Sequence, residues 1–432
     1  MDAAERQKII SLIHREVVLA TGCTEPVAVA LAAAKARETL GAIPDEVRLY
    51  LSKNIFKNAM GVGIPGTGMI GLPVAVAMGV ARGDASRQLE VLDMEKGDVD
   101  ASKQWLDSHK DSIHIAVKDN CDKLYIECEC RKGNDTATAI ISGQHTRFVY
   151  VSKNGEVLYE QQASTSTAAD DSDSDNAVSL TARKVYDFAT TAPLDEIAFI
   201  NDTAKYNMSA SDRGLAGDYG LTTGRLLMDM ARGDVVHTTV AKTVAASDAR
   251  MDGCTVPVYS NSGSGNQGIT CTIPVYEYGK LKNYSDETIT RGLIMSHLMS
   301  IYVKHGIGRL SALCGVVNAS IGVTSALTYM QGGDYRQITF AIKNMINTLT
   351  GMLCDGAKPS CALKVATGVY SAFVTAELAL HTKVVDETDG LSEADTDRSI
   401  QNVCKIGKEG MNETDDMILE IMTNKKHSEQ ID

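Results

Sequence analysis

The segment Lys123-Leu-Tyr-Ile-Glu-Cys-Glu-Cys130 alternates apolar and polar side chains, which is the pattern of a strand with one buried face. Runs of the same kind, or wholly apolar ones, lie between turn-forming sequences at residues 47–51, 113–117, 137–141 and 147–151. Strands joined by short turns pair antiparallel. We therefore expect an antiparallel β-meander with helices around it.

Helical patterns flank this meander on both sides. Apolar residues recur with helical spacing between Ile9 and Leu19, and an Ala-rich run follows Thr24. Beyond residue 177, long segments of helix-forming residues alternate with glycine-containing breaks. The predicted fold class is α+β, with N-terminal helices and an antiparallel β-meander subdomain, followed by a mostly α-helical C-terminal domain.

The segment 164–175 is rich in serine and aspartate and has almost nothing apolar to bury, so it is typical of a solvated linker. The chain of 432 residues is also longer than a single core usually supports. We place a domain boundary in this segment. The expected domains are an N-terminal α+β domain at residues 1–170, which carries the loop around Cys23, and a mostly helical domain at residues 171–432, which carries the three late cysteines Cys314, Cys354 and Cys361.

Charge and composition limit the partners. Lys and Arg number 42 against 55 Asp and Glu, so the net charge of −13 argues against nucleic acid or an anionic membrane and favours a small molecule. The ten cysteines do not form the dense framework of a small secreted domain, and the N-terminus carries no basic-then-apolar signal. We expect reduced thiols and a cytoplasmic location. Ala- and Gly-rich helices in the second half allow close packing within or between chains, which leaves a homo-oligomer open.

Membrane insertion is not expected. The most apolar stretches, such as residues 71–81, fall short of the roughly 20 residues that span a bilayer.

Three cysteines in the last third of the chain, Cys314, Cys354 and Cys361, are candidate metal ligands. Four cysteines normally hold a cubane iron–sulfur cluster, so a set of three would leave one iron open to act as a Lewis acid. Free cysteine is also among the most buried residue types. On spacing alone, three core thiols are the favoured interpretation. Cys254 and Cys271 are second-choice ligands.

Cys23 precedes Thr24, Glu25 and Pro26, a set typical of an N-cap and the first turn of a helix. The positive end of a helix lowers the pKa of a thiol, although Glu25 partly opposes this effect. Cys23 is therefore a candidate base for removing the α-proton of an amino acid. A buried small residue that caps a helical hairpin explains the local sequence equally well.

The segment Ser262-Gly-Ser-Gly-Asn-Gln-Gly268 offers unobstructed backbone N–H groups together with hydroxyl and amide side chains. Such a set suits a carboxylate. We expect Ser262, Ser264, Asn266 and Gln267 to bind substrate, and the alternative is an ordinary flexible loop between helices.

Other motifs carry less information. The string Gly61-Val-Gly-Ile-Pro-Gly66 contains a proline and lacks a clear preceding strand, so a dinucleotide site is not expected. The histidines show no zinc-ligand spacing. Four other cysteines are expected to be structural: Cys121, Cys128, Cys130 and Cys404.

Four motifs in fixed order resemble one known family: Thr21-Gly-Cys-Thr-Glu-Pro26, the segment from Ser262 to Gly268, Gly308-Arg-Leu-Ser-Ala-Leu-Cys-Gly315 and Cys354-Asp-Gly-Ala-Lys-Pro-Ser-Cys361. Together they resemble the L-cysteine desulfidase family, which is related to the iron–sulfur L-serine dehydratases, over nearly the whole chain. The resemblance implies a [4Fe-4S] cluster on Cys314, Cys354 and Cys361 and a catalytic thiol at Cys23. Thr21 and Thr24, on either side of that thiol, are expected to bind substrate.

The resemblance implies a lyase that converts L-cysteine to pyruvate, sulfide and ammonia by β-elimination. The corresponding loop of the related dehydratases reads Ser-Ser-Ser-His-Thr, whereas this chain has Ala20-Thr-Gly-Cys-Thr-Glu25 without the histidine, which argues against serine dehydration as the principal activity. Two alternatives remain: L-serine dehydration on the same cluster, and a non-catalytic thiol or iron–sulfur redox sensor. We identify no lysine and phosphate cradle for pyridoxal phosphate.

Overall fold

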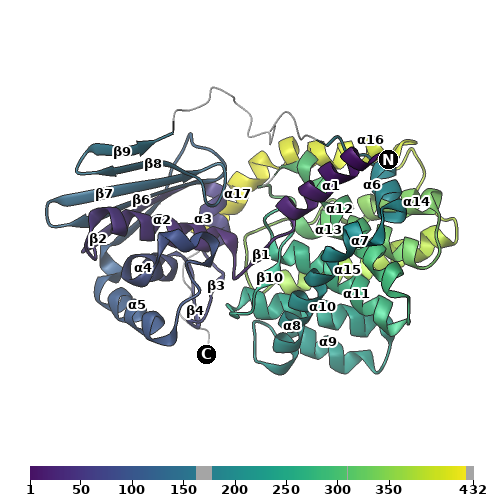
Figure 1. The fold of residues 1–432 in the computed structure, drawn as a ribbon, viewed down its shortest axis with the longest axis horizontal. Coiled ribbons are helices and arrows are strands. Elements are labelled where there is room, and N and C mark those ends of the chain that lie inside the picture. Colours follow the sequence, from purple (N-terminus) through teal and green to yellow (C-terminus); the bar gives the residue numbers. More distant parts are fainter. Residues whose placement is uncertain (162–177, 309, 425–432) are drawn as a thin grey trace.

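The structure, a computed structural model, describes residues 1–161, 178–308 and 310–424. Figure 1 shows one part built on a six-stranded sheet and a second, larger part made almost entirely of helices. The α+β fold class predicted from the sequence is confirmed. The boundary predicted at residues 164–175 lies outside the described residues.

The sheet has the strand order β5 (Ile113–Val117), β2 (Glu46–Leu51), β6 (Tyr125–Lys132), β7 (Asp135–Ser142), β8 (Phe148–Lys153) and β9 (Glu156–Glu160). Strands β6 to β9 form the predicted meander, and β2 pairs antiparallel with β6. The expectation of a wholly antiparallel sheet is wrong at β5, which lies parallel to β2.

The chain between β2 and β5 explains this difference. A long crossover permits parallel pairing, and here it consists of α3 (Lys53–Ala59), β3 (Gly63–Ile64), β4 (Met69–Ile70), α4 (Leu72–Arg82), η1 (Ala85–Glu90), α5 (Lys96–His109) and η2 (Lys110–Ser112).

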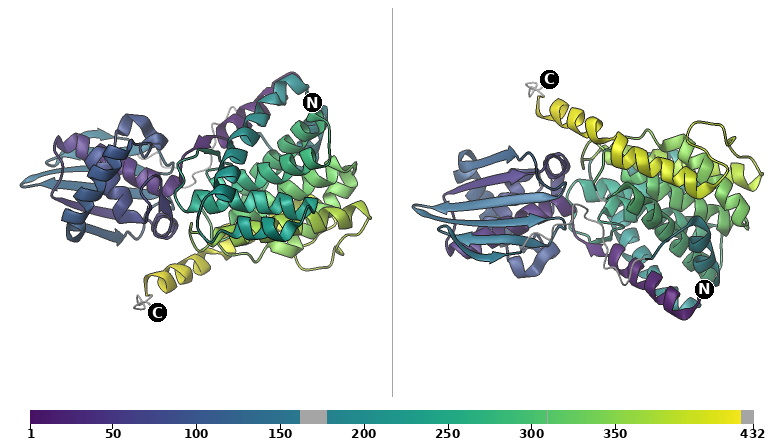
Figure 2. Two further views of the ribbon diagram at one scale, coloured as in Figure 1. Left: turned by 90° about the horizontal axis from the view of Figure 1, so that it is seen from below. Right: turned by 90° about the horizontal axis from the view of Figure 1, so that it is seen from above.

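The helices lie on one face of the sheet, with α2 (Thr24–Leu40) against β6 and β7 (Figure 2). The alternation in β6 places Ile126, Cys128 and Cys130 on that face, where all three are fully buried. The prediction that Cys128 and Cys130 pack in the core is confirmed. Helix α4 approaches α2 closely because Gly79 has no side chain: a Cβ there would lie 2.3 Å from Ala30 O.

The helical part is centred on α12 and α13. Its elements are α6 (Ala182–Thr191), α7 (Leu194–Ile197), η3 (Ala198–Ile200), α8 (Asn201–Ala216), α9 (Thr223–Ala231), α10 (Val235–Met251), β10 (Val258–Tyr259), α11 (Gly265–Leu281), α12 (Asp286–Ile307), α13 (Gly315–Met330), α14 (Tyr335–Leu349), α15 (Cys361–Leu380), α16 (Thr396–Lys405), the π-turn η4 (Ile406–Gly410) and α17 (Asn412–Thr423). Helix α13 packs against α11, α12, α14 and α15, and its buried face is almost entirely apolar or small.

Each part contributes a helix to the other. Helix α1 (Ala3–Glu16) precedes the sheet in sequence but lies on the helical part (Figure 1). Its Ile9 and Ile13 are buried in the same core as Phe188. The next strand, β1 (Leu19–Ala20), pairs with β10. In return, α17 packs on α3, where Lys57, only 2% exposed, forms an ion pair with Asp415. Helices α1 and α17 and strand β1 therefore join the two parts.

Helix α15 is long and apolar enough to cross a membrane, so the expectation that every apolar stretch is too short is wrong. In the structure it packs against α10, α13 and α14, and Val365, Val369 and Ala372 belong to the helical core. A core helix and a membrane span share this composition, and here core packing accounts for the inner face of α15.

Candidate active site

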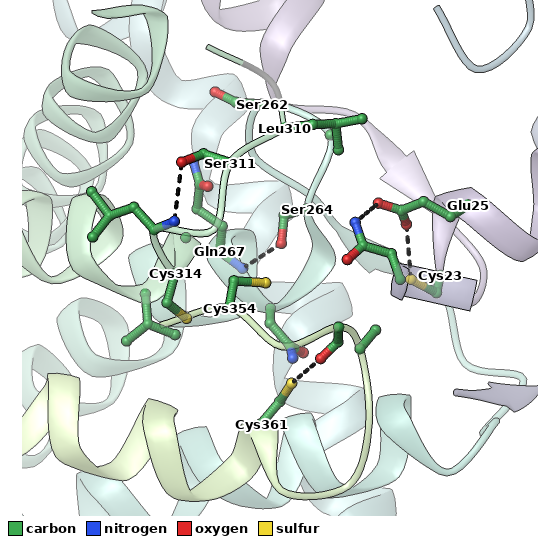
Figure 3. Close-up of a pocket in the computed structure, with 18 of the residues that line it drawn as sticks. Cys23, Glu25, Ser262, Ser264, Gln267, Leu310, Ser311, Cys314, Cys354 and Cys361 are labelled. Atoms are coloured by element: carbon green, nitrogen blue, oxygen red, sulfur yellow. Dashed lines mark hydrogen bonds between the residues drawn. The ribbon is translucent and has the colours of Figure 1, made fainter. Parts of the chain in front are cut away.

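A pocket of about 120 Å³ lies between the two parts of the molecule (Figure 3). One water needs roughly 10–15 Å³, so the pocket has room for a small organic molecule. Its lining includes most of the predicted site residues: Cys23, Ser262, Ser264, Asn266, Gln267, Cys314, Cys354 and Cys361. Predicted site residues that are far apart in the sequence therefore line one pocket.

Cys23 and Glu25 form a hydrogen-bonded pair on one wall of the pocket. Cys23 occupies the N-cap position of α2, one residue earlier than the sequence pattern indicates, and makes no side-chain capping bond. Its Sγ instead donates to Glu25 Oε2 at 3.0 Å, and Asn58 Nδ2 donates to Glu25 Oε1 at 3.0 Å. The thiol thus has an oriented carboxylate as its proton acceptor.

The expected lowering of the pKa of Cys23 is wrong. Burial and then the charge of Glu25 raise the pKa of this thiol, and Arg250 opposes them only in part. Glu25 behaves differently: burial acts to raise its pKa, but the charge of His145 and the hydrogen bonds it accepts lower the pKa overall. The resting pair is therefore a protonated thiol beside an ionised carboxylate, because desolvation outweighs the helix terminus.

All three late cysteines line the pocket. Cys314 and Cys354 lie away from Cys23 (Figure 3), whereas Cys361 packs against the small hydrophobic cluster that Cys23 forms with Val62 and Met251. Two backbone hydrogen bonds bring two of them together: Cys314 N donates to Met352 O at 3.0 Å, and Cys354 N donates to Ala312 O at 2.6 Å. Cys314 caps α13 and Cys361 opens α15. Two helix N-termini therefore contribute a thiol each to the pocket.

These thiols influence one another electrostatically. Burial and then the nearby Cys354 raise the pKa of Cys314 to about 12. Burial likewise raises the pKa of Cys361, with a further contribution from Cys354. Buried thiolates this close together need positive charge to offset their desolvation and repulsion. A bound cationic metal centre would provide it.

A lysine–aspartate cluster braces the segment between Cys354 and Cys361. Asp355 pairs with Lys358 Nζ at 2.7 Å and also with Lys364, whose Nζ donates to Leu353 O at 2.7 Å. Burial acts to raise the pKa of Asp355, but the two lysines lower it to about 2. The carboxylate is thus ionised over the whole physiological range and holds both lysines beside the cysteines.

The donor set fits a cluster better than a single metal ion. Within the part of the chain that the structure describes, no group of three or more Cys, His, Asp or Glu side chains is close enough to hold one ion. The ligands of a cubane cluster bind different irons and so stand further apart than the ligands of one ion. Three free thiols line the same pocket, which is the number of ligands that a cubane cluster with one open iron requires.

The Gly-rich segment is only partly a loop. Gly265 already begins α11, so Asn266, Gln267 and Gly268 are helical, and Ser264 caps the helix by accepting from Gln267 N at 3.4 Å. The glycines serve close packing, since a Cβ at Gly268 would lie 2.0 Å from Tyr259 O. The expectation of one continuous loop from residue 262 to residue 268 is therefore wrong. Its polar residues line the pocket, and their role in binding substrate stays a prediction.

Other predicted residues have other surroundings. Thr24 Oγ1 lies 3.1 Å from both Gly263 O and Glu25 Oε2, so it joins the two loops. Thr21 precedes Gly22 in the same loop, and neither threonine is among the described residues that line the pocket. Cys271 is fully buried in α11 and Cys254 follows α10; both lie outside this lining. A role in substrate binding for Thr21 and Thr24 stays a prediction.

Sequence reasoning missed Arg250, which also lines the pocket. It lies near the end of α10 and is only 5% exposed. Its Nη2 donates to Gly22 O at 3.1 Å and its Nη1 donates to Asn266 Oδ1 at 3.3 Å. The available signal was an arginine in a helix of small and apolar residues, a position where a charge is costly unless it has a use.

A family model described as the serine dehydratase alpha chain matches residues 105–420. A UPF0597 protein of Bacteroides fragilis is 51% identical over 432 residues, covering 98% of this chain and 100% of the relative. UPF0597 proteins of Phocaeicola vulgatus and Porphyromonas gingivalis are 52% and 48% identical, covering 98% and 99% of this chain and 98% and 100% of the relatives. The narrower resemblance to L-cysteine desulfidases stays a prediction. This chain belongs to the UPF0597 family and carries a serine dehydratase alpha chain domain.

Proposed function

We propose that this protein catalyses the iron–sulfur-dependent β-elimination of L-cysteine to pyruvate, sulfide and ammonia. The observation that carries the proposal is one pocket lined both by a thiol–carboxylate pair and by three further thiols. The pair can handle a proton, and the three thiols can hold a metal cluster. A redox sensor would need only the three thiols.

The family relationship supports the reaction class. A serine dehydratase alpha chain domain points to a lyase that performs a dehydratase-like β-elimination, and its family is related to iron–sulfur dehydratases. The same relationship keeps L-serine as the second candidate substrate. The loop around Cys23 favours L-cysteine as the substrate. The corresponding dehydratase loop reads Ser-Ser-Ser-His-Thr, and the loop of this chain lacks that histidine.

Cys314, Cys354 and Cys361 would hold a [4Fe-4S] cluster. When bound, such a cluster with an open iron supplies a Lewis acid for the departing sulfur. Lys364 and Asp355 would keep the supporting segment in place. The rest of the chemistry belongs to side chains that the structure describes.

Cys23 and Glu25 would move the α-proton. The Cys23 thiol accepts the proton from Cα while it passes its own proton to Glu25 Oε2, along the hydrogen bond already present. The electron pair of the broken Cα–H bond forms the Cα–Cβ double bond, and the Cβ–S bond breaks to release sulfide. The remaining 2-aminoacrylate tautomerises to an imine, which water hydrolyses to pyruvate and ammonia.

Turnover of the reconstituted protein tests the proposal. The chain is purified without oxygen, loaded with iron and sulfide, and supplied in turn with L-cysteine and L-serine. We expect pyruvate and sulfide from L-cysteine at a kcat/KM at least tenfold above that for L-serine. The Cys23→Ala variant should lose this activity, whereas Cys121→Ala, on the sheet side of the molecule, should keep it. A preference for L-serine would replace the substrate, and no pyruvate from either would refute the lyase.

A further inference from the structure

Arg250 is a buried cation that forms no ion pair with any carboxylate among the described residues. Its guanidinium group has five N–H donors, of which two make the hydrogen bonds to Gly22 and Asn266, while Nε has no partner. A buried charge is unfavourable without an ion-pair partner. An anionic ligand in the pocket would supply that partner.

Gln267 is a buried acceptor without a donor. It is 1% exposed and lines the same pocket, and its Oε1 has no hydrogen-bond partner. Its Nε2 donates to Asn261 Oδ1 at 2.8 Å and to Ser300 Oγ at 3.1 Å. The amide nitrogen thus donates to protein atoms, and the amide oxygen has no hydrogen-bond partner.

The orientation of the Gln267 amide follows from its neighbours. The backbone oxygen of His297 can only accept, so the Asn261 group that faces it at 3.2 Å must be Nδ2. Oδ1 of Asn261 then faces Gln267 and requires a donor there, which fixes Nε2 of Gln267 on that side. The unpaired atom is therefore an oxygen, and it needs an N–H or O–H group.

Two glycines let the backbone pack closely against these unpaired atoms. A Cβ at Gly265 would lie 2.1 Å from Arg250 Nε, and a Cβ at Gly315 would lie 3.0 Å from Gln267 Oε1. Gly315 follows Cys314 directly. The unpaired acceptor thus lies beside the segment of Cys314, whereas Arg250 contacts the loop of Cys23 through Gly22.

We propose that Arg250 and Gln267 form a two-point clamp for a free α-amino acid, in which Arg250 donates to the α-carboxylate and Gln267 Oε1 accepts from the α-ammonium group. A free amino acid is the class of ligand that carries an anion and an N–H donor on one carbon. The clamp rests on the proposed function and adds to it: substrates must have both groups unmodified. In this proposal the α-carboxylate is bound by Arg250 of α10 and not by the glycine-rich segment.

Binding of unreactive ligands tests the clamp apart from turnover. L-Alanine has both groups but no β leaving group, and propionate has the carboxylate alone. Isothermal titration calorimetry is performed on the metal-free and the iron–sulfur-loaded protein. We expect L-alanine to bind about tenfold more tightly than propionate, the difference that one good hydrogen bond to a charged group provides.

Variants assign each point of the clamp. Arg250→Gln should weaken L-alanine and propionate alike by about 100-fold, and Arg250→Lys should recover part of that loss, because it restores the charge without the planar fork. Gln267→Leu should abolish the preference for L-alanine over propionate while leaving propionate binding unchanged. The matched control is Arg225→Gln on α9, which breaks an exposed ion pair with Asp218. It should leave the affinity for both ligands unchanged.

Any of three results would overturn the clamp. The first is that the unsubstituted protein binds L-alanine in neither form. The second is that Arg250→Gln, shown by circular dichroism to be folded, keeps its affinity for L-alanine. The third is that Gln267→Leu keeps the preference over propionate. The proposed function fails separately: if the loaded protein yields no pyruvate while the binding pattern holds, the clamp stands and the β-elimination does not.

Discussion

Cys23 and Cys314 occupy the same structural position in the two parts of the molecule, yet their surroundings differ. Each is the N-cap residue of a helix, makes no side-chain capping bond and is almost fully buried. Burial raises the pKa of both thiols. Cys23 faces the carboxylate of Glu25, whereas Cys314 faces two more thiols.

The difference shows that neighbours, and not the helix terminus, decide what a buried thiol can do. A thiol hydrogen-bonded to a carboxylate can exchange protons, while a thiol grouped with other thiols can bind a metal. Adjacent residues of α3 serve the two sides: Asn58 orients Glu25, and Lys57 Nζ donates to Cys354 O at 3.2 Å. The two functions should therefore be separable by mutation.

Replacing Cys314 should have the largest effect. Cys314→Ser removes one of three proposed ligands, so we expect the loaded protein to retain almost no iron and to show no turnover. Cys23→Ser should lose turnover but bind iron as the unsubstituted chain does. Iron and sulfide analysis of both variants after anaerobic reconstitution makes the comparison, with Cys121→Ser as the control. Equal iron contents in Cys314→Ser and Cys23→Ser would contradict the assignment.

Glu25→Gln should come next in size. The amide keeps the shape of Glu25 and an oxygen that accepts from Cys23, but it can no longer take up the thiol proton. Loss of a general base typically lowers kcat by a factor of about 100 to 10,000. Steady-state kinetics with L-cysteine measures this loss, and the iron content should stay unchanged. A kcat within threefold of the original would show that Glu25 takes no part in proton transfer.

Breaking the buried ion pair of Lys57, which lies on the side of the proposed cluster ligands, should lower the free energy of unfolding. Lys57→Met leaves Asp415 largely buried without its partner, and such losses cost about 3–5 kcal/mol of unfolding free energy. Lys53→Met is the matched control on the same helix: its partner Asp416 lies at the surface, so we expect a change of about 1 kcal/mol or less. Urea denaturation measures both. Similar losses in the two variants would mean that the buried pair has no special role.

Asn58→Ala should disturb the other side alone. Without the hydrogen bond to Oε1, Glu25 loses one of the contacts that orient it toward Cys23. We expect kcat to fall by about tenfold, the size of effect that a misplaced catalytic group produces, while iron retention and stability change little. Loss of iron in this variant would show that the thiol–carboxylate pair and the three thiols are not independent.

Local patterns predicted most of the fold and fewer features of the candidate site. The strand at residues 123–130 was found because its alternation is visible in the sequence. The three late cysteines were assigned as ligands only through the resemblance to a family, because their spacing alone favoured core thiols. The parallel pairing of β5 was missed because it depends on a crossover through three helices. Arg250 was missed for a similar reason, since its partners come from the loop before α2 and from α11.

The pKa of Cys23 was mispredicted because the helix N-terminus is visible in the local sequence, whereas burial depends on the whole fold.

Alkylation of the metal-free protein measures how far Glu25 contributes to the raised pKa of Cys23, and this experiment has the smallest expected effect. Only the thiolate reacts with iodoacetamide, and Glu25 raises the pKa of Cys23 both by its charge and by accepting the thiol hydrogen bond. Glu25→Gln removes the charge, so the pKa should fall and the rate at pH 8–9 should rise by about 3–10-fold, since one pKa unit changes a small thiolate fraction tenfold. Glu25 is not among the groups that shift Cys314, so the rate at Cys314 should stay the same. Mass spectrometry of the labelled peptides between pH 7 and 10 separates the two thiols, and an equal rise at both would mean that the substitution loosens the pocket rather than removing a charge.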